Sequence, residues 1–271
     1  MRHSMRVLVA FFLRDMREDL SYRAALVIGL FGWVVMLSAF FFFARFVDSA
    51  VQVGSGVGQG GYLGFSVMGM VLMSLQQTAL SAYPQRIRAA QLTGTLEAML
   101  ATPTSPGLVL IASPFYRFTR AIFSALVMVL LAVWLFDLRF AKVDVIALAV
   151  TLPLCLLAFA SLGLLAASFT LVVRRSDPIS AFFGGFSVLA GGVFFPTHVL
   201  PGWLRTLGEV LPITHGLQLV RRAAFEGEGL ATLKHPLSML TLFCVIVAPV
   251  GLVFFSWAVR RARRDGSMNH Y

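Results

Sequence analysis

Side chains that could bind a nucleotide or a metal are few in this chain of 271 residues. A phosphate-binding loop needs a lysine that directly follows glycine, but Lys142 follows alanine and Lys234 follows leucine. Cys155 and Cys244 fall in apolar stretches far apart in the sequence, without the spacing of a zinc site or a disulfide framework. We therefore expect no ATP, metal or other cofactor to bind this chain.

Catalytic groups are equally scarce. His198 and His215 share one loop, but no cysteine or carboxylate cluster accompanies them to complete a ligand set. The sequence has no G-x-S-x-G elbow, and no acid/base pair lies within an apolar stretch. These absences predict that the chain is not an enzyme.

The residues with the clearest potential for an interaction lie in the stretch TGTLEAMLATPTSP, 93–106. Leucine and methionine recur there at helical spacing, so we predict a short helix that ends before Pro103, with Glu97 near its start. Its apolar stripe could dock into a groove of another protein, or lie on the bilayer or on the N-terminal helix. The residues concerned are Thr95, Leu96, Glu97, Met99 and Leu100.

The elements that must position this helix lie in a bilayer. Hydrophobic residues make up 58% of the chain and charged residues 13%, which excludes an ordinary soluble domain. Several stretches approach the roughly 20 apolar residues that a span needs. We predict one transmembrane domain, 1–271, of all-α class with six spans at about 24–44, 62–83, 117–136, 145–173, 178–195 and 236–259.

Arginine placement predicts the orientation. Arginines gather near both termini, at 84–120 and at 174–175, whereas most basic residues of the other side share one long loop. Because Lys and Arg of short loops stay in the cytoplasm, we expect a protein of the inner membrane with both termini cytoplasmic and a cytoplasmic segment at 84–116. The net charge of +10 is then a signal of topology, and we expect no nucleic-acid partner.

Residues 1–23 predict an amphipathic helix in the cytoplasmic interface. Apolar side chains such as Leu8, Phe12 and Met16 fall on one face, and Arg6 and Arg14 fall on the other.

The fifth predicted span has a ribbon of small residues that would let another helix approach closely. The ribbon could pack within the chain, form an interface between two copies, or be a wall that slides when a path opens. Packing within the chain is the simplest of the three. The residues are Ser180, Gly184, Ser187 and Gly191.

The outer loop that follows, 196–235, is too long and too apolar for a solvated linker. Prolines divide it into short pieces, which suit re-entrant helices that dip back into the outer leaflet and plug an exit. Trp203 suits an interfacial anchor. The residues expected at this gate are Phe195, Pro196, Pro201, Trp203 and Pro212.

The predicted spans contain almost no ionisable residue at mid-depth, where ion-coupled transporters usually have one. If the protein transports a substrate, we expect its energy to come from elsewhere. An ATP-independent channel or carrier would need a polar path, for which Gln76 and Gln77 are the concentrated candidates. A membrane assembly subunit without transport of its own is a further alternative.

Three segments together resemble the permease subunit of type-2 ABC exporters, and the resemblance covers nearly the whole chain. They are LSYRAAL at the end of the N-terminal helix, QLTGTLEAMLATP after span two, and GGVFFPTHVLPGWLRTLGEVLPITHGLQLVRR after span five. The resemblance implies that 94–102 is a coupling helix that docks on a separate cytoplasmic ATPase, with Glu97 in the contact. It also implies that 195–212 forms re-entrant helices at the outer end of the path.

The same resemblance implies the partners. Two permeases, expected here as a homodimer surrounded by membrane lipids, would assemble with two ATPase subunits that hold ATP and magnesium. A lipid, glycan or amphipathic drug-like substrate would then pass outward between the permeases.

Overall fold

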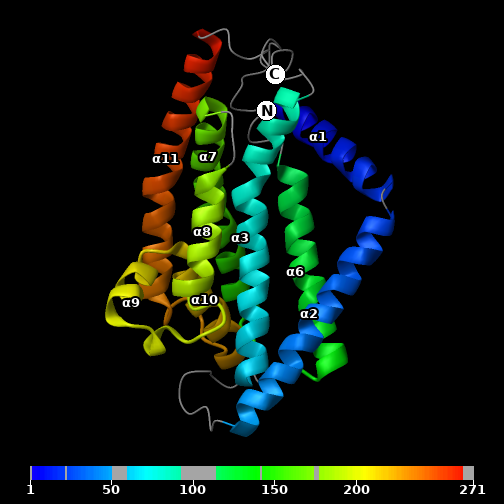
Figure 1. The fold of residues 1–271 in the computed structure, drawn as a ribbon, viewed down its shortest axis with the longest axis vertical. Coiled ribbons are helices and arrows are strands. Elements are labelled where there is room, and N and C mark those ends of the chain that lie inside the picture. Colours follow the sequence, from blue (N-terminus) through cyan, green and yellow to red (C-terminus); the bar gives the residue numbers. More distant parts are fainter. Residues whose placement is uncertain are drawn as a thin grey trace.

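The computed structural model is a bundle of helices, and it describes residues 2–21, 23–50, 60–92, 114–140, 142–173 and 177–264 (Figure 1). All regular elements in these ranges are helical. In chain order they are α1 (Arg2–Ser21), α2 (Arg23–Ala50), α3 (Gly61–Leu92), α6 (Phe115–Phe136), α7 (Val145–Val173), α8 (Pro178–Ala190), the 3₁₀ turn η1 (Thr197–Val199), α9 (Gly202–Glu209), α10 (Pro212–Arg221), the π turn η2 (Arg222–Glu226) and α11 (Lys234–Arg264).

Five helices of the described part are long and apolar enough to cross a bilayer, and they fall in five of the six predicted spans. The chain is therefore an all-helical integral membrane protein. The five stretches are Val27–Phe46, Gly61–Leu92, Phe115–Phe136, Val145–Val173 and Lys234–Arg261.

Two of these helices, α3 and α7, form the centre of the bundle. They pack on one another, and α7 also packs along α11. A methyl group on Gly163 of α7 would collide with the backbone oxygen of Ala79 on α3, so the glycine lets the two backbones approach closely. Large side chains such as Phe159, Leu72 and Leu75 fill the core around this contact.

The fifth predicted span, 178–195, differs from the others. Its helix α8 has 13 residues, about 20 Å at the usual rise, which is shorter than the roughly 30 Å of hydrocarbon. The helix ends at Gly191, and Gly192 has φ +76°, a left-handed conformation that side chains disfavour. The chain therefore turns at these glycines, and the apolar residues that follow them lie outside the helix.

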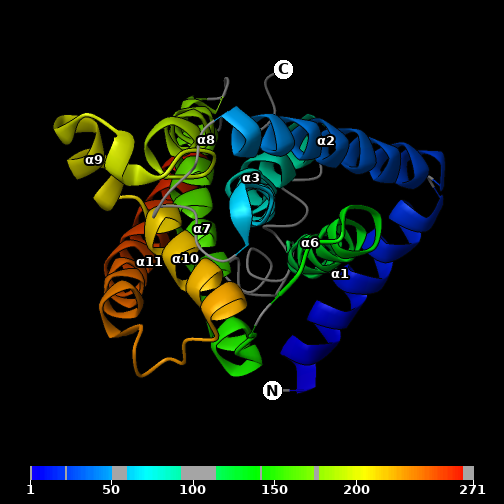
Figure 2. The same ribbon diagram turned by 90° about the horizontal axis from the view of Figure 1, so that it is seen from below.

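The two ends of the bundle carry different elements. The start of α1 and the last turns of α11 lie at one end, here called the terminal end, while α10 lies toward the opposite end (Figure 1). Seen from that opposite end, α6 lies inside the angle that α1 and α2 make (Figure 2). Helix α3 has 32 residues, so its length of about 48 Å exceeds the hydrocarbon thickness.

The segment expected to contain the coupling helix falls at 93–113, outside the described residues. Nothing in the structure describes Thr95, Leu96, Glu97, Met99 or Leu100. Its flanking helices are described: α3 ends at Leu92, and α6 begins at Phe115.

Replacing Gly163 by alanine should destabilise the protein, because the added methyl group must push α3 and α7 apart. We expect the free energy of unfolding to fall by about 1–3 kcal/mol, the usual effect of overpacking. The matched control is Gly32→Ala on α2, where a methyl group meets no atom within 4 Å. Thermal unfolding in detergent checks both variants, and equal losses would contradict the close-contact role of Gly163.

Candidate functional site at the two ends of the bundle

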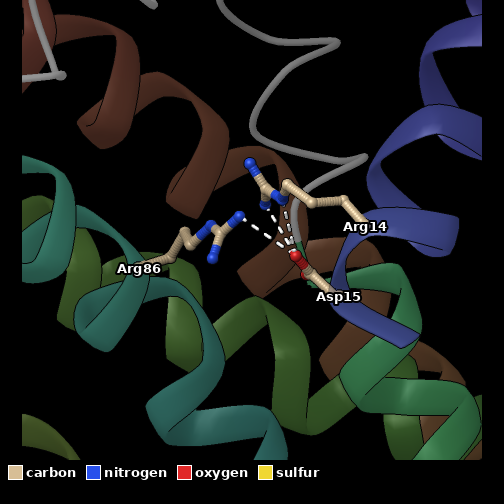
Figure 3. Close-up of polar contacts among 3 residues, drawn as sticks. All are labelled: Arg14, Asp15 and Arg86. Atoms are coloured by element: carbon tan, nitrogen blue, oxygen red, sulfur yellow. Dashed lines mark hydrogen bonds and ion pairs between the residues drawn. The ribbon is translucent and has the colours of Figure 1, made fainter. Parts of the chain in front are cut away.

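At the terminal end, a buried carboxylate fastens α1 to α3. Asp15 on α1 accepts hydrogen bonds from Arg14 at 2.7 and 2.9 Å and from Arg86 of α3 at 3.3 Å (Figure 3). Asp15 is only 8% exposed. A carboxylate removed from water needs such partners, and the one from Arg86 holds α1 against α3.

A second set of contacts fastens α1 to α6. The Arg120 guanidinium donates to Asp19 at 2.6 Å, and the Phe12 ring packs edge-on against Tyr116, with ring centroids 5.3 Å apart. Arg117 of α6 in turn donates to the Gln85 amide oxygen of α3 at 2.8 Å. The two helices that flank 93–113 are thus tied to α1 and to one another.

Sequence reasoning did not assign a role to Asp15 or Asp19. Three apolar residues of α1, Val9, Leu13 and Leu20, are 51%, 39% and 55% exposed, so the buried contacts of α1 do not come from its apolar face alone. An available signal was the spacing of the two aspartates at i and i+4, which puts them on one face of the helix.

The small-residue ribbon of α8 lies against α3 in the described chain. Ser180 Oγ donates to the Leu80 carbonyl oxygen at 3.1 Å, and Gln76 Nε2 donates to Ser187 Oγ at 2.7 Å. Gly184 faces the Gln77 side chain. Gln76, 1% exposed, is therefore bonded to a neighbouring helix, which is the usual role of an amide within spans.

The last member of the ribbon, Gly191, lies beyond the end of α8. A Cβ atom there would come within 2.7 Å of Ile213 on α10. The ribbon as a whole thus packs on α3 and α10.

The predicted gate residues lie in different surroundings. Phe195 and Trp203 are 54% and 66% exposed. Pro196 is half-buried and precedes η1, Pro201 is exposed and precedes α9, and Pro212 is buried at the first position of α10, where its missing N–H is tolerated. The structure does not bring the five together into one cluster.

Helix α10 is buried for most of its length, between α3, α7 and α11. Its first turn also contacts the end of α9: Thr214 Oγ1 donates to the Gly208 carbonyl at 2.7 Å, and His215 Nε2 lies 2.8 Å from the Glu209 carbonyl oxygen. Burial lowers the pKa of His215, so its neutral form is favoured.

One arginine joins three parts of the chain beside α10. The Arg221 guanidinium donates to the carbonyl oxygens of Gly192, Val193 and Phe65, each at 2.9 Å. It also stacks 3.4 Å from the centre of the Phe65 ring. Burial lowers the pKa of Arg221 to about 9, so it stays charged at neutral pH.

Sequence reasoning used Arg221 only as one of the basic residues of the outer loop. Its partners lie 28, 29 and 156 residues away along the chain, so no local pattern indicates them. We call the contacts of Arg221 with Phe65, Gly192 and Val193 the Arg221 clasp.

The fold defines a polytopic helical membrane protein. Two of its spans, α3 and α6, are tied to α1 at the terminal end, and the buried α10 lies toward the other end. This chain belongs to the ABC-2 type transporter family, whose model matches residues 4–225. It is accordingly the membrane-spanning permease subunit of an ABC transporter, and the family implies a partner ATPase. No curated protein sequence matches the chain.

Replacing Asp15 by asparagine should loosen α1. The change leaves Arg14 and Arg86 without their carboxylate, and we expect a loss of about 1–3 kcal/mol locally because the site is mostly buried. Amide hydrogen exchange across 9–20 should speed up accordingly. The control is Asp137→Asn, which removes an exposed ion pair with Arg139 at the other end of α6. Such an exposed pair contributes little to stability. Unchanged amide exchange in the Asp15 variant would contradict the anchoring role.

Replacing Arg221 by lysine should weaken the attachment of Gly192 and Val193 to α10 and α3 although the charge is kept. One ammonium group cannot reproduce a planar guanidinium that donates to three carbonyl groups and stacks on a ring. We expect stability to fall by about 2 kcal/mol, since a buried carbonyl loses its donor, with faster amide exchange across 192–200. Arg205→Lys on exposed α9 is the control, and equal behaviour of the two variants would argue against the clasp.

Proposed function

We propose that this chain is the permease subunit of an ATP-driven exporter. A separate ATPase hydrolyses ATP with magnesium at the terminal end, which faces the cytoplasm. Two copies of the chain enclose a path through which a lipid, a glycan or an amphipathic drug-like molecule moves outward. The family match supports the class of protein, and the direction and substrate class rest on the arguments below.

The attachment of α3, α6 and α1 to one another carries this proposal. The segment 93–113 leaves α3 after Leu92 and precedes α6, and Asp15 and Asp19 join both helices to α1. A force applied by an ATPase to a helix at 94–102 would therefore act on three anchored helices together. This is what a coupling element requires, because a ligand shifts a conformational equilibrium only through contacts that differ between two states.

Charge supports the cytoplasmic placement of the terminal end. Arg86, Arg117 and Arg120 gather there at the ends of α3 and α6, and Arg260 and Arg261 lie in the last turns of α11. Positively charged residues beside spans are enriched on the cytoplasmic side. The inner membrane is the proposed location.

The part of the chain that contains α9 and α10 supports outward transport of the substrate. We propose that α9 and α10 form a re-entrant structure that closes the outer end of the path, held shut by the Arg221 clasp. Irregular backbone at membrane depth is tolerated where protein buries it, and Gly192 and Val193, which follow α8, are buried in this way beside α10. Trp203, exposed on α9, suits the interface between lipid and water.

The exposed aromatic side chains of α2 and α8 support the proposal that a second copy of the chain forms the other wall of the path. Phe31, Phe42 and Phe182 are 68%, 69% and 62% exposed. An apolar path of this kind suits amphipathic substrates. An ion-coupled carrier would need a polar path instead, and Gln76, a candidate for it, is bonded to Ser187.

Replacing Glu97 by arginine should weaken the attachment of the ATPase without affecting membrane insertion. The measurement is co-purification in detergent of whatever ATP-hydrolysing subunit the genomic neighbours encode, followed by quantification of its ratio to the permease. We expect that ratio to fall severalfold, on the scale of about 1 kcal/mol or more for a reversed charge at an interface. Glu209→Arg, on the exposed face of α9, is the control, and an unchanged ratio for the Glu97 variant would count against the coupling role.

A further inference from the structure

A polar cavity of about 500 Å³ lies at the terminal end, where α1, α2, α3 and α6 meet. This volume is within the usual range of ligand pockets, about 300–1,000 Å³. Five charged residues line it: Asp15 and Asp19 from α1, Arg86 from α3, and Arg117 and Arg120 from α6. The cavity walls thus carry one more positive than negative charge.

The three arginines that line the cavity differ in their partners. Arg86 lies 3.3 Å from Asp15, which also pairs with Arg14 at 2.7 Å, and Arg120 lies 2.6 Å from Asp19. Arg117 donates to the neutral amide of Gln85, and no described carboxylate lies within the 4 Å of an ion pair with it. The charge of the cavity therefore suits an anionic ligand.

The backbone adds to the same positive potential. Arg117 lies in the first turn of α6, which has no acidic residue, and Pro114 provides no side-chain cap. The start of a helix carries the positive end of its dipole and favours negative groups. Arg117 therefore adds its charge to a positive potential that the backbone already provides.

The position of the cavity indicates which kind of anion it binds. Its arginines lie at the ends of two spans, the depth at which lipid headgroups lie, while Trp33, Ala121 and Ser124 extend its wall along α2 and α6. We propose that the cavity binds the phosphate group of an anionic phospholipid from the leaflet at the terminal end. The Arg117 guanidinium donates hydrogen bonds to the phosphate oxygens, and the glycerol lies toward Ser124 and Trp33.

This site goes beyond the proposed transport function. A lipid bound there would bridge α1, α2 and α6 beside the segment 93–113, and it requires neither an ATPase nor a transported substrate. The same phosphate chemistry could be supplied by a soluble phosphate, so the test compares the two sources.

Trp33 provides the readout because it lines the cavity. Trp134, Trp203 and Trp257, which are 82%, 66% and 47% exposed, are replaced by phenylalanine, and the protein is placed in nanodiscs of phosphatidylcholine. A minor fraction of lipid with brominated acyl chains, either phosphatidylglycerol or phosphatidylcholine, then quenches Trp33. We expect about a fivefold preference for phosphatidylglycerol, the scale of one basic side chain acting on anionic lipid.

Three variants separate the site from the general charge of this surface. Arg117→Gln should abolish the preference, and Arg117→Lys should keep most of it. Arg88→Gln removes an exposed arginine of α3 that does not line the cavity, and it should leave the preference unchanged. Size-exclusion chromatography reports whether each variant is folded. If Arg117→Gln is not folded, the test is the quenching of wild-type protein by the two brominated lipids.

Equal quenching of wild-type protein by the two brominated lipids would overturn the proposal. So would a preference that survives in the Arg117→Gln variant or that disappears equally in Arg88→Gln. Inorganic phosphate is added in a separate arm: if it removes the preference, the ligand is a soluble phosphate and the lipid assignment fails, whereas a preference that persists supports lipid.

Discussion

Backbone carbonyl groups that lose their helical partners inside a membrane protein need another donor, since no bulk water is present to supply one. This constraint governs the half of the bundle that lies opposite the terminal end. Helix α8 ends at Gly191, and the chain then turns through Gly192 and Val193; Arg221 donates to both of those carbonyls. By also bonding Phe65 of α3, the same guanidinium joins the broken segment to the central helix, so α10 can remain buried.

At the terminal end, the helices are joined by ion pairs. Asp15 and Asp19 join α1 to α3 and α6, and the loop between those two helices is the proposed contact with the ATPase. Helix α3 connects the two ends, because it contacts α1 through Arg86 and the Arg221 clasp through Phe65. A displacement at one end thus has a continuous packed route to the other, with α7 held against α3 at Gly163 along the way.

The sequence predicted the elements better than it predicted their contacts. Hydropathy placed five spans that the structure contains, and prolines marked the starts of η1, α9 and α10, because their effect is local. The end of α8 differs from expectation since hydropathy carries no information on the left-handed turn at Gly192. Asp15 and Arg86 are 71 residues apart, so periodicity alone could not pair them, and the coupling residues 95–100 stay a prediction.

We propose that ATP hydrolysed at the terminal end moves α9 and α10. A fluorophore attached to a cysteine at position 203 on exposed α9 tests it directly, in the permease purified with its ATPase and placed in nanodiscs. ATP with magnesium should change the environment of this fluorophore. A Glu97→Arg variant should lose the response, while a Glu209→Arg variant should keep it. Active ATP hydrolysis with no change at position 203 would contradict a coupling between the two ends.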